Sequence, residues 1–273
     1  MQAVLDDPMV QAGLAPLLVA LLVGGVLLRT RLAWFAVAAA LATTVGLSTG
    51  ISFTPLSASR KLLLLVLVAP WVGLAIDLLP KPLRATLPVL ALLCGAASIW
   101  VFWSVLSQRE PAQALLLAAG VASFVALMVA LTLRLRNDGA AGAGATVALG
   151  LAVGVAAVLS ASIGNFANGI AVACGGGALL LLQFALDRRL APGYLGMLSV
   201  GLATALFAAA TFMLAQLPWY AMPLLLLVPL AAGLDVAARR PARLRMVFAT
   251  LVPLAVSTAT MLAAWVATRA TTS

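Results

Sequence analysis

Arg60 and Lys61 are adjacent residues whose types could hold an anion. They stand in the stretch TPLSASRKL, residues 54–62, at the start of a long apolar run. A guanidinium binds carboxylate or phosphate through two parallel hydrogen bonds, and the hydroxyls of Ser57 and Ser59 are close enough in sequence to assist. One interpretation is a docking point for an anionic lipid headgroup, an acidic solute or an acidic partner. The favoured interpretation is a membrane-edge anchor whose long side chains reach out to the headgroups.

Asp77 and Asp235 are the deepest carboxylates in the apolar runs, and each is followed four residues later by a base, Lys81 or Arg239. Ionisable groups inside a membrane are costly and mark functional sites. One interpretation is therefore a pair of coupling carboxylates in a proton-driven carrier. The favoured interpretation is a salt bridge at the membrane edge, because both acids map near the end of an expected helix.

A polar break interrupts the apolar sequence in SASIGNFANGIAVACGGG, residues 160–177. Ser160, Ser162, Asn165 and Asn168 gather there among glycines. One interpretation is a substrate-binding break, because unwound helix segments bind substrates in many carriers. The favoured interpretation is a plain turn between two helices, because asparagine and glycine favour turns.

The residues that most enzymes and metalloproteins need are missing. The chain has no histidine, and its two cysteines, Cys94 and Cys174, are isolated in separate apolar runs. Phosphate-binding glycine loops and nucleophile–base pairs are also missing. We therefore expect no cofactor, no metal and no enzymatic activity. A lipid-modifying enzyme that holds a phosphate with Arg60 and Lys61 is a third interpretation, and it lacks an evident base.

The composition indicates which elements must position these residues. Hydrophobic residues make up 64% of the chain and charged residues only 8%, whereas soluble domains carry about 25% charged residues. Apolar runs recur at the length of about 20 residues that a helix needs to cross a bilayer. They do not alternate as the strands of a membrane barrel would. We predict an all-α fold, a polytopic helical membrane bundle that forms a single transmembrane domain over residues 1–273.

Ten helices are predicted from the apolar runs and the breaks between them. They cover residues 13–29, 32–51, 61–79, 86–107, 112–133, 143–161, 167–186, 193–215, 219–237 and 246–267.

The basic residues predict the orientation, because cytoplasmic loops are rich in lysine and arginine. With ten helices, twelve of the sixteen basic residues fall on one side and four on the other. The minority side holds Arg60, Lys61, Arg109 and Arg269. We therefore expect a multi-pass protein of the plasma membrane, such as the bacterial inner membrane, with both termini extracytoplasmic. The net charge of +9 follows from these loops and does not indicate a nucleic-acid partner.

Two short stretches suggest an internal duplication. LLRTRLA at 27–33 resembles ALDRRLA at 185–191, which would relate helices 1–4 to helices 7–10 as a parallel repeat. The alternative is chance similarity, because chains rich in alanine and leucine align easily with one another.

These patterns favour a permease or transporter-like component for a small or amphiphilic solute. The alternative is a non-catalytic accessory or scaffold subunit of a larger membrane complex, which would explain the shortage of intramembrane charge. The expected partners are the lipid bilayer, other membrane subunits and anionic lipid.

Overall fold

The computed structural model describes residues 10–48, 57–80, 85–187, 190–215, 217–234 and 242–272. Over these residues the regular structure consists only of helices, ten of them α-helices. A π-helical turn (Val10–Leu14) precedes the first α-helix, and a 3-10 turn (Arg31–Trp34) precedes the second. The α-helices are α2 (Ala15–Val26), α3 (Phe35–Ser48), α4 (Ala58–Asp77), α5 (Thr86–Leu106), α6 (Pro111–Leu133), α7 (Gly139–Leu159), α8 (Ile163–Leu186), α9 (Gly193–Ala215), α10 (Ala221–Ala232) and α11 (Ala242–Thr272).

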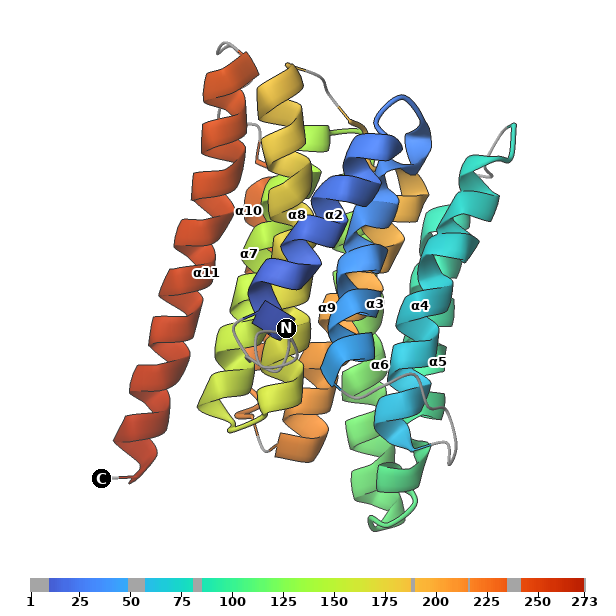
Figure 1. The fold of residues 1–273 in the computed structure, drawn as a ribbon. Coiled ribbons are helices and arrows are strands. Elements are labelled where there is room, and N and C mark those ends of the chain that lie inside the picture. The colour runs from blue at the N-terminus through green and yellow to red at the C-terminus, as the bar shows by residue number, and fades with distance from the viewer. Residues whose placement is uncertain are drawn as a thin grey trace.

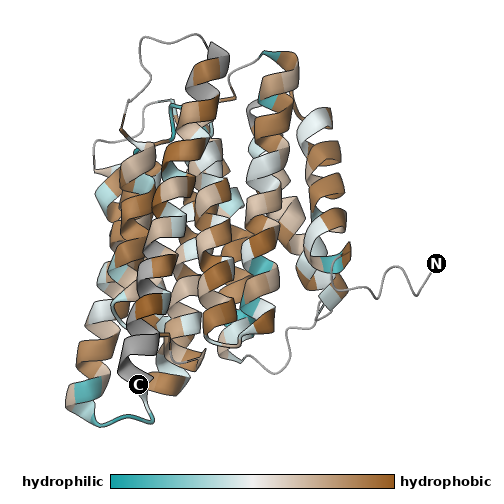
Figure 2. Ribbon diagram, turned by 90° about the vertical axis from the view of Figure 1, so that its left-hand side faces the viewer, coloured by the Kyte–Doolittle hydropathy of each residue, from teal (hydrophilic) through white to brown (hydrophobic). Residues whose placement is uncertain are grey.

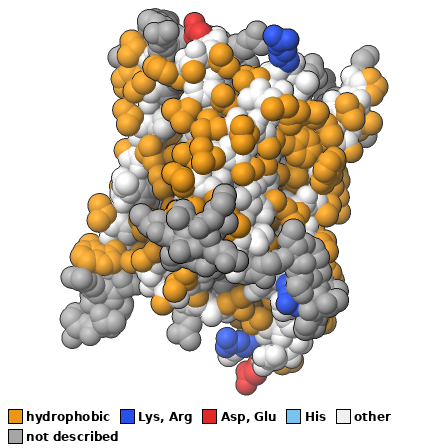
Figure 3. Space-filling view, in the orientation of Figure 1, with side chains coloured by type: hydrophobic (Ala, Val, Ile, Leu, Met, Phe, Trp, Pro, Cys, Tyr) orange, Lys and Arg blue, Asp and Glu red, His pale blue; other side chains and the backbone are white. Residues whose placement is uncertain are grey.

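The all-helical bundle predicted from the sequence is confirmed, and each predicted segment corresponds to one described helix. Six helices, α4 to α9, are long enough and apolar enough to cross a membrane. The other apolar stretches are shorter, at 10–17 residues. Hydrophobic residues dominate along the helices (Figure 2), and in the space-filling view hydrophobic side chains lie between charged residues near the upper and lower edges (Figure 3).

Helices adjacent in sequence run in opposite directions, so α2, α4, α6, α8 and α10 all end at the top of the bundle in Figure 1. We call this end the basic end. Arg29, Arg134 and Arg136 belong to the turns there. Arg60, Lys61 and Arg109 lie at the opposite end, at the start of α4 and the end of α5. These described basic residues therefore lie at the two ends of the bundle in the same division that the prediction of orientation used.

Helices α7 and α9 form the centre of the bundle. Of the most apolar stretch of each helix, 83% is buried in α9 and 72% in α7, compared with 28% in α4 and α6. Close approach at glycines makes this packing possible. A Cβ added at Gly73 of α4 would lie 2.6 Å from the Leu195 Cα of α9, and one at Gly169 of α8 would lie 2.6 Å from the Gly154 nitrogen of α7. Gly150 and Gly154, the GxxxG pair of α7, therefore serve helix packing.

Most hydroxyl groups in the core donate to their own helices, and Ser257 of α11 donates instead to the Ala148 carbonyl of α7. Thr44, Thr146 and Ser199 each donate to the carbonyl four residues earlier, at 3.2, 2.7 and 2.6 Å. Thr132, Thr204 and Thr211 do the same. Such bonds satisfy the hydroxyl without a partner on another helix. In the described part of the core, these hydroxyl groups are therefore already satisfied by the backbone of their own helices.

The break between α7 and α8 differs from the prediction. The turn comprises only Ser160, Ala161 and Ser162, with Ala161 at φ 56°. The predicted helices left residues 162–166 between them, and this was wrong for Asn165, which lies within α8 together with Asn168. The reason is tertiary: the Asn165 side chain donates to the Thr211 hydroxyl of α9 at 3.1 Å, so it supports the helix start against a neighbour.

The starts and ends of several other helices also shift. α7 begins at Gly139 rather than at 143, because Asp138 caps it, and α4 ends at Asp77. The described helix therefore does not extend from Asp77 to position 81, and the predicted salt bridges of Asp77 and Asp235 stay predictions. Lys81, Asp235 and Arg239 lie outside the described residues.

Candidate functional site

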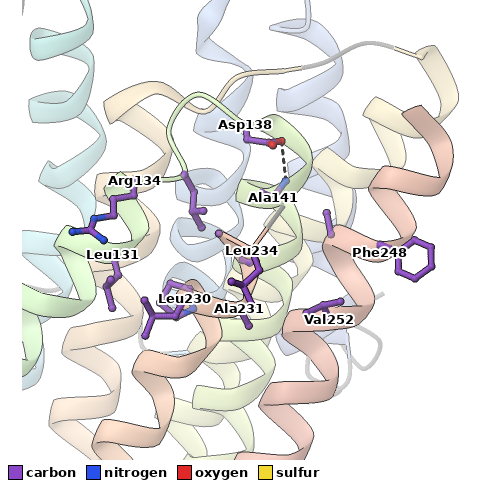
Figure 4. A pocket seen from close by; sticks show the side chains of 14 residues that line it. Leu131, Arg134, Asp138, Ala141, Leu230, Ala231, Leu234, Phe248 and Val252 are labelled. Atoms are coloured by element: carbon purple, nitrogen blue, oxygen red, sulfur yellow. Dashed lines mark hydrogen bonds between the residues drawn. The ribbon is translucent and has the colours of Figure 1, made fainter. Parts of the chain in front are cut away.

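A cavity of about 430 Å³ opens at the basic end, between α6, α7, α10 and α11. Its walls are mainly aliphatic, with Leu131 near the end of α6, and Leu230 in α10 and Leu234 just after it (Figure 4). Leu135, in the turn after α6, also lines the cavity. Val252 contributes from α11. A volume of this size lies in the range of small-molecule sites, which are typically mostly apolar with a few placed polar groups.

The cavity forms because α10 is short and the α6–α7 turn is compact. α10 has 12 residues, about 18 Å of helix, against a hydrocarbon thickness of about 30 Å. Pro229 lies in its last turns, and proline donates no backbone hydrogen bond, so the carbonyl four residues earlier loses its helical partner. The chain reverses between α6 and α7 within residues 134–138. The end of α10 therefore faces a hollow.

Two charged residues mark the rim of the cavity. Arg134 is exposed, and its guanidinium lies on the α6 side, at the edge rather than inside, whereas Asp138 lies across the mouth at the start of α7 (Figure 4). The Asp138 Oδ1 accepts hydrogen bonds from the N–H groups of Ala140 and Ala141, at 3.1 and 3.2 Å. Because its charge faces the N-terminus of α7, the aspartate is in part committed to capping that helix. Among the described lining residues, Arg134 is the cation at the rim.

This arrangement suits an amphiphile. An apolar tail could enter among the leucines, while an anionic group could meet Arg134 at the edge. Among the described lining residues, Asp138 is the only carboxylate, and it caps α7.

Asp77, the described member of the predicted carboxylate pair, caps α9 from another helix. Its Oδ1 accepts from the Tyr194 N–H and its Oδ2 from the Leu195 N–H, both at 2.9 Å. The first N–H groups of a helix lack partners within the helix, so one carboxylate satisfies two of them. Gly193, at φ 63°, leaves room for it, since a Cβ there would lie 2.5 Å from the Asp77 Oδ2. This contact gives Asp77 a structural role, and its role in coupling stays a prediction.

Arg60 and Lys61 lie in the first turn of α4. The Ser57 Oγ accepts from the Arg60 N–H at 3.4 Å and so caps the helix, and Ser59 is exposed. The Lys61 Nζ lies 4.9 Å from the centre of the Trp100 ring of α5. A cation over an aromatic face is attracted by the ring, so Lys61 joins the ends of α4 and α5. This geometry agrees with an anchoring role, and the anion-docking hypothesis stays a prediction.

The polar break is brought against α9 rather than into a cavity. The Ser160 hydroxyl donates to the Ala156 carbonyl of its own helix at 2.9 Å. Asn165 reaches α9 as described above, while Ser162 and Asn168 are half-buried. The structure therefore brings Asn165 to Thr211 and does not bring these four residues together around a described cavity.

Two further cavities are lined almost entirely by apolar side chains. One, of about 320 Å³, lies between α6 and α10 near the opposite end and includes Gly120, Phe124 and Trp219. The other, of about 560 Å³, lies between α7 and α11. Its two hydroxyls are occupied, with Ser257 donating to the Ala148 carbonyl at 3.3 Å and Thr258 to the Ala255 carbonyl at 2.9 Å.

Several residues at the basic end have roles that the sequence does not reveal. The Trp34 ring nitrogen donates to the Leu190 carbonyl at 3.0 Å. Gln183, fully buried, donates to the Gly139 carbonyl at 3.3 Å and accepts from the Leu190 N–H at 3.4 Å. Together they fix the link before α9. A lone amide in the apolar run LLLLQFAL is a signal for such a buried bond, and an aspartate before a small-residue helix, as at Asp138, is a signal for a cap.

Among the described residues, no group of three or more histidine, cysteine or acidic side chains could hold a metal ion. Cys94 and Cys174 are free thiols on different helices. Comparison with protein-family models gives no match, and comparison with curated proteins gives no match either.

Proposed function

We propose that this chain is a multi-pass membrane component that binds a small amphiphilic solute at the basic-end cavity, as a permease or transporter-like subunit does. The observation that carries the proposal is the amphipathic cavity itself, with aliphatic walls and Arg134 at its rim. The cavity lies beside α10, the short helix, and away from the tightly packed contact between α7 and α8. A solute there could change the contacts of α10 without disrupting the core.

The proposal includes ten membrane crossings with the basic end in the cytoplasm and both termini outside, in a bacterial inner membrane. The positive-inside rule supports this orientation. The short helices need a thinned bilayer or flanking segments to complete their crossings, and membranes adapt to such mismatch at modest cost.

The proposal is tested with the full chain in nanodiscs of zwitterionic lipid. We expect alkyl phosphates or other amphiphiles to raise the melting temperature, because a ligand that binds only the native state stabilises it by about 2.7 kcal/mol at a hundred times its Kd. Arg134→Gln should reduce the shift. Arg109→Gln is the matched control, since Arg109 is also exposed but lies at the opposite end.

A scaffold subunit is the second candidate, and one observation favours it. No charged side chain is buried among the described residues, and their buried polar side chains all have hydrogen-bond partners. A carrier of ions or polar solutes would need polar groups along its path. Absence of any ligand-induced stabilisation, together with co-purification of another membrane protein in fixed stoichiometry, would replace the first proposal with this one.

A further inference from the structure

The basic-end cavity and the apolar cavity beside Trp219 lie on the same face of α6. Six of the lining residues on this helix, or directly after it, recur at intervals of three or four positions, which is the spacing of a single helical face. They are Leu116, Gly120, Phe124, Leu127, Leu131 and Arg134. Only one helical turn, between Leu127 and Leu131, separates the two sets.

The facing helix shows the same continuity. On and beside α10, the apolar cavity is lined by Trp219, Met222, Pro223 and Leu226, and the basic-end cavity is lined by the consecutive residues 229–234. The two cavities therefore follow one another along the contact between α6 and α10, which we call the α6–α10 seam. From Leu116 to Arg134 the seam spans 18 helical positions, or about 27 Å, close to the full hydrocarbon thickness.

The chemistry changes from one end of the seam to the other. Near Trp219 the lining is apolar except for the Ser123 hydroxyl. At the basic end it finishes with Arg134 and Asp138, and Asp138 is engaged by the N–H groups of α7. The complementary ligand has one anionic head and a long apolar chain. The chain must exceed the depth of one leaflet to fill both cavities, since one leaflet covers only about half of the hydrocarbon thickness.

We propose that the α6–α10 seam binds one long-chain lipid whose oxyanion head lies at Arg134 and whose chain extends along α6 into the cavity beside Trp219. The inference rests on the proposed function, because it names the class of amphiphile and extends its site. Arginine suits phosphate and carboxylate heads alike through bidentate contact. A cationic or short-chain amphiphile would leave part of the seam without a complementary group.

Gly120 provides a selective way to block the chain. A Cβ added there meets no atom within 4 Å, so Gly120→Leu should fill the apolar cavity without disturbing the helix. Gly25, which also has open space around its Cβ position and lies on α2, provides the matched control Gly25→Leu. Both variants should melt close to the native chain.

The experiment measures binding of hexyl phosphate, hexadecyl phosphate and a longer polyisoprenyl phosphate to the full chain in zwitterionic nanodiscs. We expect Arg134→Gln to weaken all three by about tenfold, as expected for a lost hydrogen bond to a charged group. Gly120→Leu should weaken only the long-chain ligands, several-fold, while Gly25→Leu changes none. A long-chain ligand with bromine at the end of its chain should quench the fluorescence of Trp219 more than the unbrominated ligand does. Trp219→Phe should abolish this additional quenching.

The head is identified by replacing it. Palmitate that binds as tightly as hexadecyl phosphate supports a general oxyanion site, and weaker palmitate binding supports a lipid phosphate. Equal binding of hexadecyltrimethylammonium overturns the proposal. Unchanged long-chain binding in Gly120→Leu, with loss in Arg134→Gln, also overturns it but leaves solute binding at the basic-end cavity in place. Failure of every amphiphile to bind would instead overturn the proposed function.

Discussion

Asp77 satisfies the start of α9 from a different helix, and this contact gives the first prediction. Asp77→Ala leaves the N–H groups of Tyr194 and Leu195 without their acceptor, which should lower the free energy of unfolding by about 1–3 kcal/mol. The free energy of unfolding of Asp77→Asn should lie between those of the native chain and Asp77→Ala, because the amide oxygen can still accept from one N–H. Thermal melting in mild detergent measures both effects.

The control for Asp77 is Glu110→Ala, which removes an exposed acid at the opposite end of the bundle. Such a surface substitution should change the free energy of unfolding by no more than about 0.5 kcal/mol. If Asp77→Ala melts like the native chain, the cap is not needed for stability. A normal melting temperature with lost transport would restore the coupling role for this carboxylate.

At the scale of the helix, the crossing of α7 and α8 depends on missing side chains. Gly169→Ala should destabilise the protein by about 1–3 kcal/mol, because a Cβ there would lie 2.6 Å from the Gly154 nitrogen and the helices would have to move apart. Gly177→Ala, on the same helix, meets no atom within 4 Å. It should be neutral or stabilising by up to about 1 kcal/mol, since alanine favours the helix. Equal effects of the two substitutions would contradict the observed packing.

For the whole molecule, the prediction concerns the number of crossings. Reporter fusions after Thr30 and after Ser57 flank α3, and fusions after Trp219 and after Leu234 flank α10. Each pair should report opposite sides of the membrane if all ten helices cross. If only α4 to α9 cross, the two members of each pair will report the same side. A fusion after Arg136 should report the cytoplasm, as the positive-inside rule requires.

The sequence alone determined the helical class and the position of nearly every helix. Long apolar runs, with breaks between them, are a one-dimensional signal, and in lipid each run must satisfy its backbone groups within itself, which makes it a helix. Because successive helices run in opposite directions, the order of the helices along the chain then determined which turns lie at the same end of the bundle. Asp138 before Gly139 and Ser57 before Ala58 are residue types that favour caps, but the predicted helices began later, at residues 143 and 61 rather than 139 and 58.

Only the tertiary structure decided which faces meet. Asp77 and Tyr194 are 117 positions apart in sequence and Asn165 and Thr211 are 46 apart, and no local pattern joins them. The helices are apolar on most sides, so hydrophobic periodicity does not indicate how each is rotated about its axis. Rotation and neighbours depend instead on close contacts at glycines such as Gly73 and Gly169. The α6–α10 seam depends on this rotation and on these neighbours, because packing places the short α10 against one face of α6.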